Sequence, residues 1–146
     1  MAKETILILD NEFHNQWFLR NLLETEKYMV VTAHFIEKAR SYFSEFEITG
    51  LITEYWIDQT NSLKMIQELK KMFPATYVMM LTNHQTKENE YEEIIQAGVD
   101  DFFLKPFSYR KILLHLRKGL DRRNIFLQKM RLEQELNQNR RMGKPR

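Results

Sequence analysis

Residues 97–107, Ala-Gly-Val-Asp-Asp-Phe-Phe-Leu-Lys-Pro-Phe, combine the end of a helix, a short strand and a lysine that directly follows it. Gly98 comes after the helical run 87–97, where a left-handed C-terminal cap is expected. Residues 101–104, Asp-Phe-Phe-Leu, predict a short strand, which ends at Lys105-Pro106. This stretch therefore contains one strand–helix junction and one strand end that carries a charged side chain.

The same order of strand and helix recurs outward along the chain. Short apolar runs predict strands, and apolar residues spaced by three or four positions predict helices. The predicted strands are 5–9, 28–33, 48–53, 76–81 and 101–104, and the predicted helices between them are 13–26, 35–46, 62–73 and 87–97. With a further helix after the last strand, this alternation predicts right-handed crossovers and a parallel sheet covered by helices on both faces.

The apolar stripe of the first predicted helix indicates which of its residues are buried. Trp17, Phe18, Leu22 and Leu23 fall on one side of residues 13–26. We therefore expect this side to face the sheet, with Trp17 in the core.

Polar side chains follow four of the predicted strands. In open parallel sheets, sites form at the carboxyl ends of the strands. A carboxylate can act as a nucleophile towards phosphorus, hard cations prefer oxygen ligands, and a hydroxyl and an ammonium can hold phosphoryl oxygens. The strand ends supply all these groups: Asp10-Asn11-Glu12, Glu54, Thr82-Asn83 and Lys105-Pro106.

Three motifs carry a family resemblance, namely residues 6–12 (ILILDNE), 78–83 (VMMLTN) and 97–107 (AGVDDFFLKPF). Over about residues 4–120 the chain resembles the receiver domain of two-component response regulators, including the chemotaxis regulators. The resemblance implies a flavodoxin-like α/β fold, a doubly wound five-stranded parallel sheet of order 2-1-3-4-5. It also implies a signalling module, not an enzyme, that takes a phosphoryl group from a sensor histidine kinase.

The resemblance assigns roles to five residues. Asp10 matches the first residue of the acidic pocket, Lys105 the phosphate-contacting lysine, and Thr82 the switch hydroxyl. Phe102 matches the aromatic switch position, although an aromatic residue beside a strand is more often a core residue. Pro106 is the candidate for a cis peptide bond.

Two residues depart from the family pattern. Glu54 stands at the phosphoacceptor position, where the family has aspartate, and Asn11 replaces the second acid of the pocket. The extra methylene of Glu54 extends its carboxylate by about 1.5 Å, and a misplacement of that order can slow a positioned reaction by about 10²-fold. Asp10 and Glu54 are the remaining candidate metal ligands, so Mg²⁺ binding is expected to be weak or absent.

These departures predict a degraded phosphotransfer site, that is, a pseudo-receiver that acts through protein–protein interaction. The segment after Glu54, residues 55–61, also has neither the Pro nor the Gly usual in the family. The alternative reading keeps phosphorylation, on Glu54 or on a nearby acid such as Asp58.

The C-terminal part differs in charge from the rest of the chain. Residues 1–107 contain 10 Lys and Arg against 17 Asp and Glu, a net charge of −7, whereas residues 108–146 carry +9. A helix is predicted from the N-cap Ser108 to Arg141. We expect a receiver domain over 1–120 and a helical extension over 121–146, with a disordered tip at 142–146.

Heptad spacing along this helix predicts a coiled coil and a homodimer. One row contains Leu113, Leu120, Leu127 and Gln134, and the other contains Leu116, Arg123, Met130 and Asn137. A single amphipathic helix is the alternative. A nucleic-acid partner for the basic helix is a further alternative, but we do not expect one, because no winged-helix or helix-turn-helix domain follows and aromatic stacking residues are nearly absent.

Composition excludes several classes of protein. The chain has 146 residues and no cysteine, which excludes disulfides and thiolate metal sites. No apolar run is long enough to span a membrane, and residues 1–4 lead into the first strand without a secretory signal. These features predict a cytoplasmic protein without a membrane partner.

Overall fold

The computed structural model describes residues 4–143, in which five strands form one parallel sheet. Its strands are β1 (Thr5–Leu9), β2 (Met29–Ala33), β3 (Gly50–Thr53), β6 (Tyr77–Thr82) and β7 (Asp101–Leu104). They lie in the order β2-β1-β3-β6-β7. Counted along the chain, this is the order 2-1-3-4-5, so the predicted flavodoxin-like α/β fold is confirmed.

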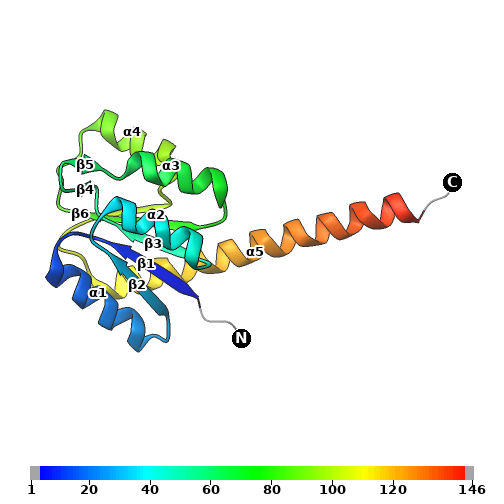
Figure 1. The fold of residues 1–146 in the computed structure, drawn as a ribbon, viewed down its shortest axis with the longest axis horizontal. Coiled ribbons are helices and arrows are strands. Elements are labelled where there is room, and N and C mark those ends of the chain that lie inside the picture. Colours follow the sequence, from blue (N-terminus) through cyan, green and yellow to red (C-terminus); the bar gives the residue numbers. More distant parts are fainter. Residues whose placement is uncertain (1–3, 144–146) are drawn as a thin grey trace.

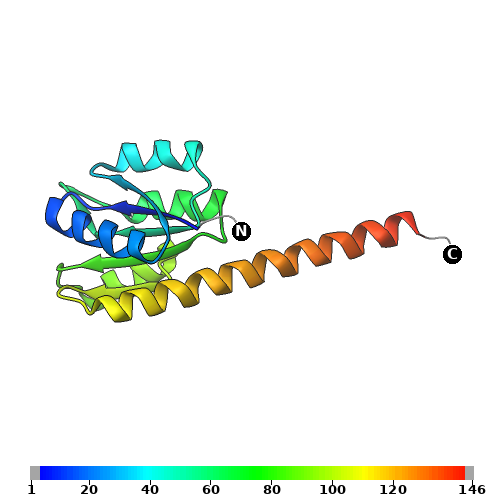
Figure 2. The ribbon, with the colours of Figure 1, turned by 90° about the horizontal axis from the view of Figure 1, so that it is seen from below.

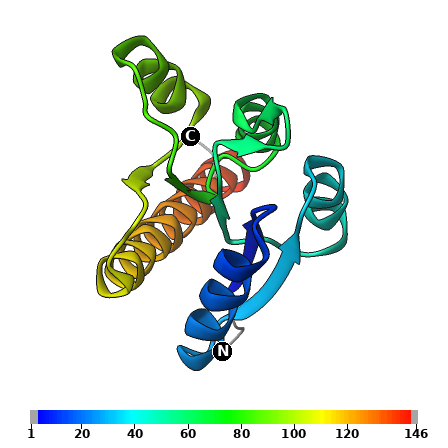
Figure 3. The ribbon, with the colours of Figure 1, turned by 90° about the vertical axis from the view of Figure 1, so that its left-hand side faces the viewer.

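Helices cover both faces of the sheet. They are α1 (Phe13–Thr25), α2 (Ile36–Glu45), α3 (Leu63–Met72), α4 (Glu88–Ala97) and α5 (Tyr109–Met142). Figure 3 shows α1 and α5 on one face and α2, α3 and α4 on the other. The three-layer arrangement buries both faces of the central strands, which explains why residues 5–9 are apolar without alternation.

The two faces of the sheet make two separate cores. Ile6 and Ile8 of β1 pack with residues of α1 and α5, whereas Leu7 and Leu9 pack with residues of α2, α3 and α4. Successive side chains of a strand point to opposite faces, so one short strand contributes to both cores.

The prediction that Trp17 lies in the core is wrong. Trp17 is 59% exposed, and Phe18 on the same stripe is 44% exposed. The buried residues of α1 are Gln16, Leu19 and Leu23. Gln16 faces inward because its side-chain amide donates hydrogen bonds to the backbone oxygens of Asp10 (3.0 Å) and Ala33 (2.8 Å), contacts that an apolar side chain could not make.

A small antiparallel ribbon, β4 (Trp56–Ile57) and β5 (Thr60–Asn61), follows β3. The predicted strands do not include this ribbon. A two-residue turn joins the strands, and its first residue, Asp58, has a φ of 58°. Aspartate tolerates this left-handed conformation, so the turn forms without the glycine that would have signalled it.

Helix α5 starts as predicted, with the Ser108 hydroxyl accepting a hydrogen bond from the Lys111 N–H. Its 34 residues extend about 51 Å. The helix crosses the sheet and leaves it at the amino edge, opposite the strand ends that carry the polar residues (Figures 1 and 2). Every described residue from Arg131 onward is exposed.

Part of the predicted coiled-coil seam is used inside the domain. Leu116 and Leu120 are 0% and 2% exposed and belong to the core between α5 and the sheet. Gly119 allows the close approach, because a Cβ atom there would lie 2.2 Å from the ring of Tyr77. Leu116 and Leu120 are therefore not available for a partner helix.

No helix within residues 4–143 has the length and apolar character needed to cross a membrane. The predicted disordered tip falls partly on residues 144–146, which lie outside the described residues, while α5 extends through Met142.

Candidate functional site

Three of the predicted site residues meet at the carboxyl edge of the sheet. Asp10 follows β1, Glu54 follows β3 and Lys105 follows β7. The Lys105 ammonium lies 3.1 Å from Asp10 Oδ2 and 3.0 Å from Glu54 Oε2. The three side chains are 12%, 6% and 9% exposed for Lys105, Asp10 and Glu54, so this cluster is shielded from water.

Backbone groups hold the other oxygen of each carboxylate. The Glu12 N–H donates to Asp10 Oδ1 at 2.9 Å, and the Tyr55 N–H donates to Glu54 Oε1 at 2.6 Å. Each acid is thus fixed between one backbone donor and the shared ammonium. Ion pairs of low exposure need this kind of full hydrogen bonding to offset the loss of hydration.

Burial and charge act in opposite directions on this cluster. Burial raises the pKa of Asp10 above its ordinary value, although the Glu12 N–H and Lys105 counteract it. Burial works to lower the pKa of Lys105, but the charges of Asp10 and Glu54 and their hydrogen bonds outweigh it and raise that pKa. Lys105 therefore stays protonated and holds the two acids together.

Thr82 and Phe102 lie near the same edge of the sheet. Thr82 is fully buried, and its hydroxyl accepts a hydrogen bond from the His84 N–H at 2.9 Å. Its backbone oxygen accepts from the Lys105 N–H at 2.8 Å, which connects the end of β6 to the lysine. Phe102 is half-buried, packs against the α2–α4 core and meets the Tyr91 ring edge-on. The Lys105–Pro106 peptide bond is cis.

Asn11 does not join the cluster. It is exposed, and its side-chain amide donates to Asp58 Oδ1 in the ribbon turn at 3.1 Å. Within residues 4–143, no group of three or more His, Cys, Asp or Glu is placed to hold a metal ion. The residues present do not fit the family's magnesium site, since Asp10 and Glu54 already share Lys105 and position 11 supplies no carboxylate.

An aromatic cluster beside the site was not predicted from the sequence. The His84 ring stacks on buried Tyr55, with centroids 4.5 Å apart and planes 10° apart. Trp56 Nε1 donates to His84 Nδ1 at 3.2 Å, and His84 Nε2 lies 3.2 Å from a Glu90 carboxylate oxygen. The cluster joins the ribbon after Glu54 to the first turn of α4. Residues 55, 56, 84 and 90 have no common spacing, so only the fold could reveal it.

A model of the response regulator receiver domain matches residues 6–117. Among curated proteins, the chain is 29% identical over 124 residues to the aerobic respiration control protein ArcA of Escherichia coli strain K12, covering 84% of this chain and 50% of ArcA. It is 27% identical over 117 residues to the transcriptional regulatory protein ResD of Bacillus subtilis, covering 80% and 48%. The chain spans about half the length of these relatives.

Solved receiver structures share the fold. A CheY-like receiver domain protein from Methanospirillum hungatei JF-1 superposes with a TM-score of 0.80 at 19% identity, covering 84% of this chain and 98% of the other. The receiver domain dimer of beryllofluoride-activated NtrC4 superposes with a TM-score of 0.76 at 24% identity, covering 82% and 98%.

Proposed function

Because the chain belongs to the response regulator receiver domain family, we propose that it is a two-component signalling module that acts by protein–protein contact and does not accept phosphate in the usual way. It is thus a pseudo-receiver, in which Glu54 takes the place of the phosphorylated aspartate. The observation that carries this proposal is the 3.0 Å contact between Glu54 and Lys105. That contact uses the ammonium which the family resemblance assigns to the phosphoryl group.

The charge at Glu54 is permanent but smaller than that of a phosphoryl group. A glutamate contributes one negative charge, whereas a phosphorylated side chain contributes about −1.5 to −2 at neutral pH. Lys105 is held at the cluster by Asp10 and Glu54 together. We therefore propose a fixed lysine position and only a partial imitation of the phosphorylated state. Magnesium, which has no full set of carboxylates here, is proposed to bind weakly or not at all.

The proposed partner is a sensor histidine kinase or another signalling protein. Aromatic residues on the outer side of α1 are exposed close to Asp10, with Phe13 at 65% and Trp17 at 59%. Aromatic side chains are enriched at the buried centres of protein interfaces. These two residues therefore support a docking surface beside the candidate site.

Treatment of the natural chain with acetyl phosphate and magnesium tests the proposal. We expect the intact mass to stay unchanged, because Glu54 is paired with Lys105 and position 11 provides no acid for the metal. A stoichiometric gain of one phosphoryl group would overturn the proposal. Peptide mapping of that product to Glu54 or Asp58 would support the phosphorylatable alternative.

We also propose that the projecting part of α5 pairs with the same segment of a second copy. Ile125, Leu132 and Leu136 are 65%, 53% and 57% exposed. Their spacings of seven and four residues are those of a coiled-coil seam. This seam replaces the one predicted from Leu116 and Leu120, which lie in the core of the domain. The NtrC4 receiver domain, similar in fold, has been solved as a dimer.

Sedimentation of a Leu132→Gln/Leu136→Gln variant tests the pairing. We expect the dimer dissociation constant to rise at least about tenfold, because the variant has lost two exposed leucines that dimerisation would bury. Leu114→Gln is the matched control, since Leu114 is 52% exposed on the part of α5 that lies against the domain. A natural chain that stays monomeric but shows a gel mobility shift with DNA that weakens as the salt concentration rises would instead favour nucleic-acid binding.

A further inference from the structure

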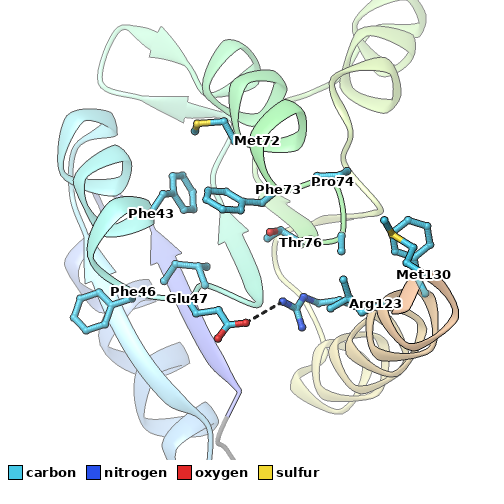
Figure 4. A pocket seen from close by; sticks show the side chains of 13 residues that line it. Phe43, Phe46, Glu47, Met72, Phe73, Pro74, Thr76, Arg123 and Met130 are labelled. Carbon is cyan, nitrogen blue, oxygen red and sulfur yellow. Dashed lines mark ion pairs between the residues drawn. The ribbon is translucent and has the colours of Figure 1, made fainter. Parts of the chain in front are cut away.

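A cavity of about 310 Å³ lies at the amino edge of the sheet, on the opposite side of the domain from Glu54 and Lys105. One wall is α5, and the others are the end of α2 and the segment between α3 and β6 (Figure 4). Its lining is mainly apolar and includes the aromatic and thioether side chains of Phe43, Phe73, Phe126, Met72 and Met130. We call it the Arg123 cavity, after the arginine that lines it.

Arg123 is an unusual residue for this lining. It lies on α5 one turn beyond Gly119, and its side chain is only 11% exposed. Its Nε–H donor is buried and has no hydrogen-bond partner within residues 4–143. Nη1 donates to Asn124 Oδ1 at 3.4 Å, so the described residues satisfy the guanidinium only in part, which is rare for a group of such low exposure.

Glu47 is the only acid in the lining, and it pairs with Arg123 weakly. Its carboxylate lies 3.9 Å from Arg123 Nη2, which is beyond hydrogen-bond length, and its side chain is 87% exposed. Figure 4 shows the two side chains reaching towards each other across the cavity. Glu47 can therefore turn into solvent when a stronger acceptor reaches the guanidinium.

We propose that the Arg123 cavity binds a small apolar carboxylate. Its hydrocarbon body lies against the phenylalanine and methionine side chains, and its carboxylate pairs with Arg123. The guanidinium group matches a carboxylate with charge-assisted hydrogen bonds, and Nη2, which lies 3.9 Å from the Glu47 carboxylate, is the donor that such a ligand would meet. The volume is at the lower end of the range of ligand pockets, about 300–1,000 Å³, which favours a compact molecule.

Methyl NMR of the whole chain, labelled at its methionines, tests this proposal with 2-naphthoate as the probe. Met72 and Met130 line the cavity, whereas Met65 and Met79 are buried in the core of the domain and serve as internal references. We expect saturable shifts of the Met72 and Met130 signals on addition of naphthoate, with the two reference signals unchanged.

Charge variants separate the arginine contact from apolar adsorption. Arg123→Gln should weaken naphthoate binding at least about tenfold, because a charge-assisted bond is lost. Glu47→Gln should strengthen binding, because it removes a competing acid. Arg131→Gln is the matched control, since Arg131 is exposed and outside the cavity, and it should change nothing. The neutral analogue 2-naphthalenemethanol should bind the natural chain and the Arg123→Gln variant equally.

Three results would overturn the proposal. The first is the absence of saturation at Met72 and Met130 up to about 1 mM naphthoate, the weak limit of specific binding. The second is an equal loss of binding in the Arg123→Gln and Arg131→Gln variants. The third is a shift of the Met72 signal with protein concentration alone, which would show that a second copy of the chain fills the cavity, because Met72 lies on α3 and outside the α5 segment proposed to pair.

Discussion

The Asn11→Asp/Glu54→Asp double variant is expected to take a phosphoryl group from acetyl phosphate at least about 100-fold faster than the natural chain. The shorter side chain at position 54 withdraws the carboxylate by about 1.5 Å from Lys105 and leaves room for a phosphoryl group. The new aspartate at position 11 adds an oxygen ligand for magnesium beside Asp10. Intact mass measured over time after mixing gives the rate, and lability to hydroxylamine identifies an acyl phosphate.

The single variants show which defect dominates. Asn11→Asp alone should remain inert, because Glu54 still occupies Lys105. Glu54→Asp alone should gain less than the double variant, because the metal still lacks its second acid. A folded double variant that gains no phosphoryl group would show that residues other than Asn11 and Glu54 prevent phosphorylation. The ribbon that holds Asp58 and Trp56 over this edge would then be the next segment to change.

Replacement of Lys105 by methionine is expected to lower the free energy of unfolding by about 3–5 kcal/mol at neutral pH, because it removes the shared cation of two shielded carboxylates. Urea denaturation followed by circular dichroism measures the change. Burial already raises the pKa of Asp10, and without Lys105 that pKa rises further. A carboxyl with a raised pKa favours the folded state at low pH, so the deficit should shrink as pH falls through that value.

Lys70→Met provides the matched control for this variant. Lys70 lies 3.0 Å from Asp100, but it has a single carboxylate partner and the two side chains are 20% and 36% exposed. Its loss should cost no more than about 1 kcal/mol. Adding Glu54→Gln to Lys105→Met should recover part of the stability, because one of the two facing charges is gone. Equal losses for Lys105→Met and Lys70→Met would contradict the assigned role of the cluster.

Most of the fold could be predicted because the strands are short, continuous apolar runs separated by helical spacing. The run Ile6 to Leu9 is apolar at every position, and it is buried at every position. Gly98 was correctly placed as a helix cap and has a φ of 113°. A parallel sheet then needs its strand ends at one edge, which is why Asp10, Glu54 and Lys105 could be expected to meet.

The errors arose where a side chain's surroundings, not its type, decide its position. Gln16 is buried because its amide donates to two backbone oxygens, and with Gln16 facing inward the next residue, Trp17, faces solvent. The heptad rows of α5 were interpreted as a partner seam, but Leu116 and Leu120 pack on the sheet. A repeat of apolar residues indicates that one face of a helix is buried, but it does not indicate whether the same domain or a partner helix buries it.

Contacts between loops that are distant in the sequence could not be predicted, for a related reason. The Asn11–Asp58 bond joins residues 47 positions apart, and His84 meets Tyr55 only because the ends of β3 and β6 are neighbours. The segment 56–61 lacks the alternation and the glycine that usually signal a hairpin. Its ribbon depends on Asp58 adopting a conformation that no spacing rule encodes.

Helix α5 packs most closely on the sheet where Gly119 meets Tyr77, so this contact is the point about which a change in the tilt of α5 would occur. The helix continues unbroken from this contact to Met142, about 35 Å further along its axis. Because the helix has no break along that length, a change in its tilt at Tyr77 displaces the far end by a distance that grows with the length of the helix. A small repacking of the core is thereby turned into a larger displacement of whatever the outer helix holds.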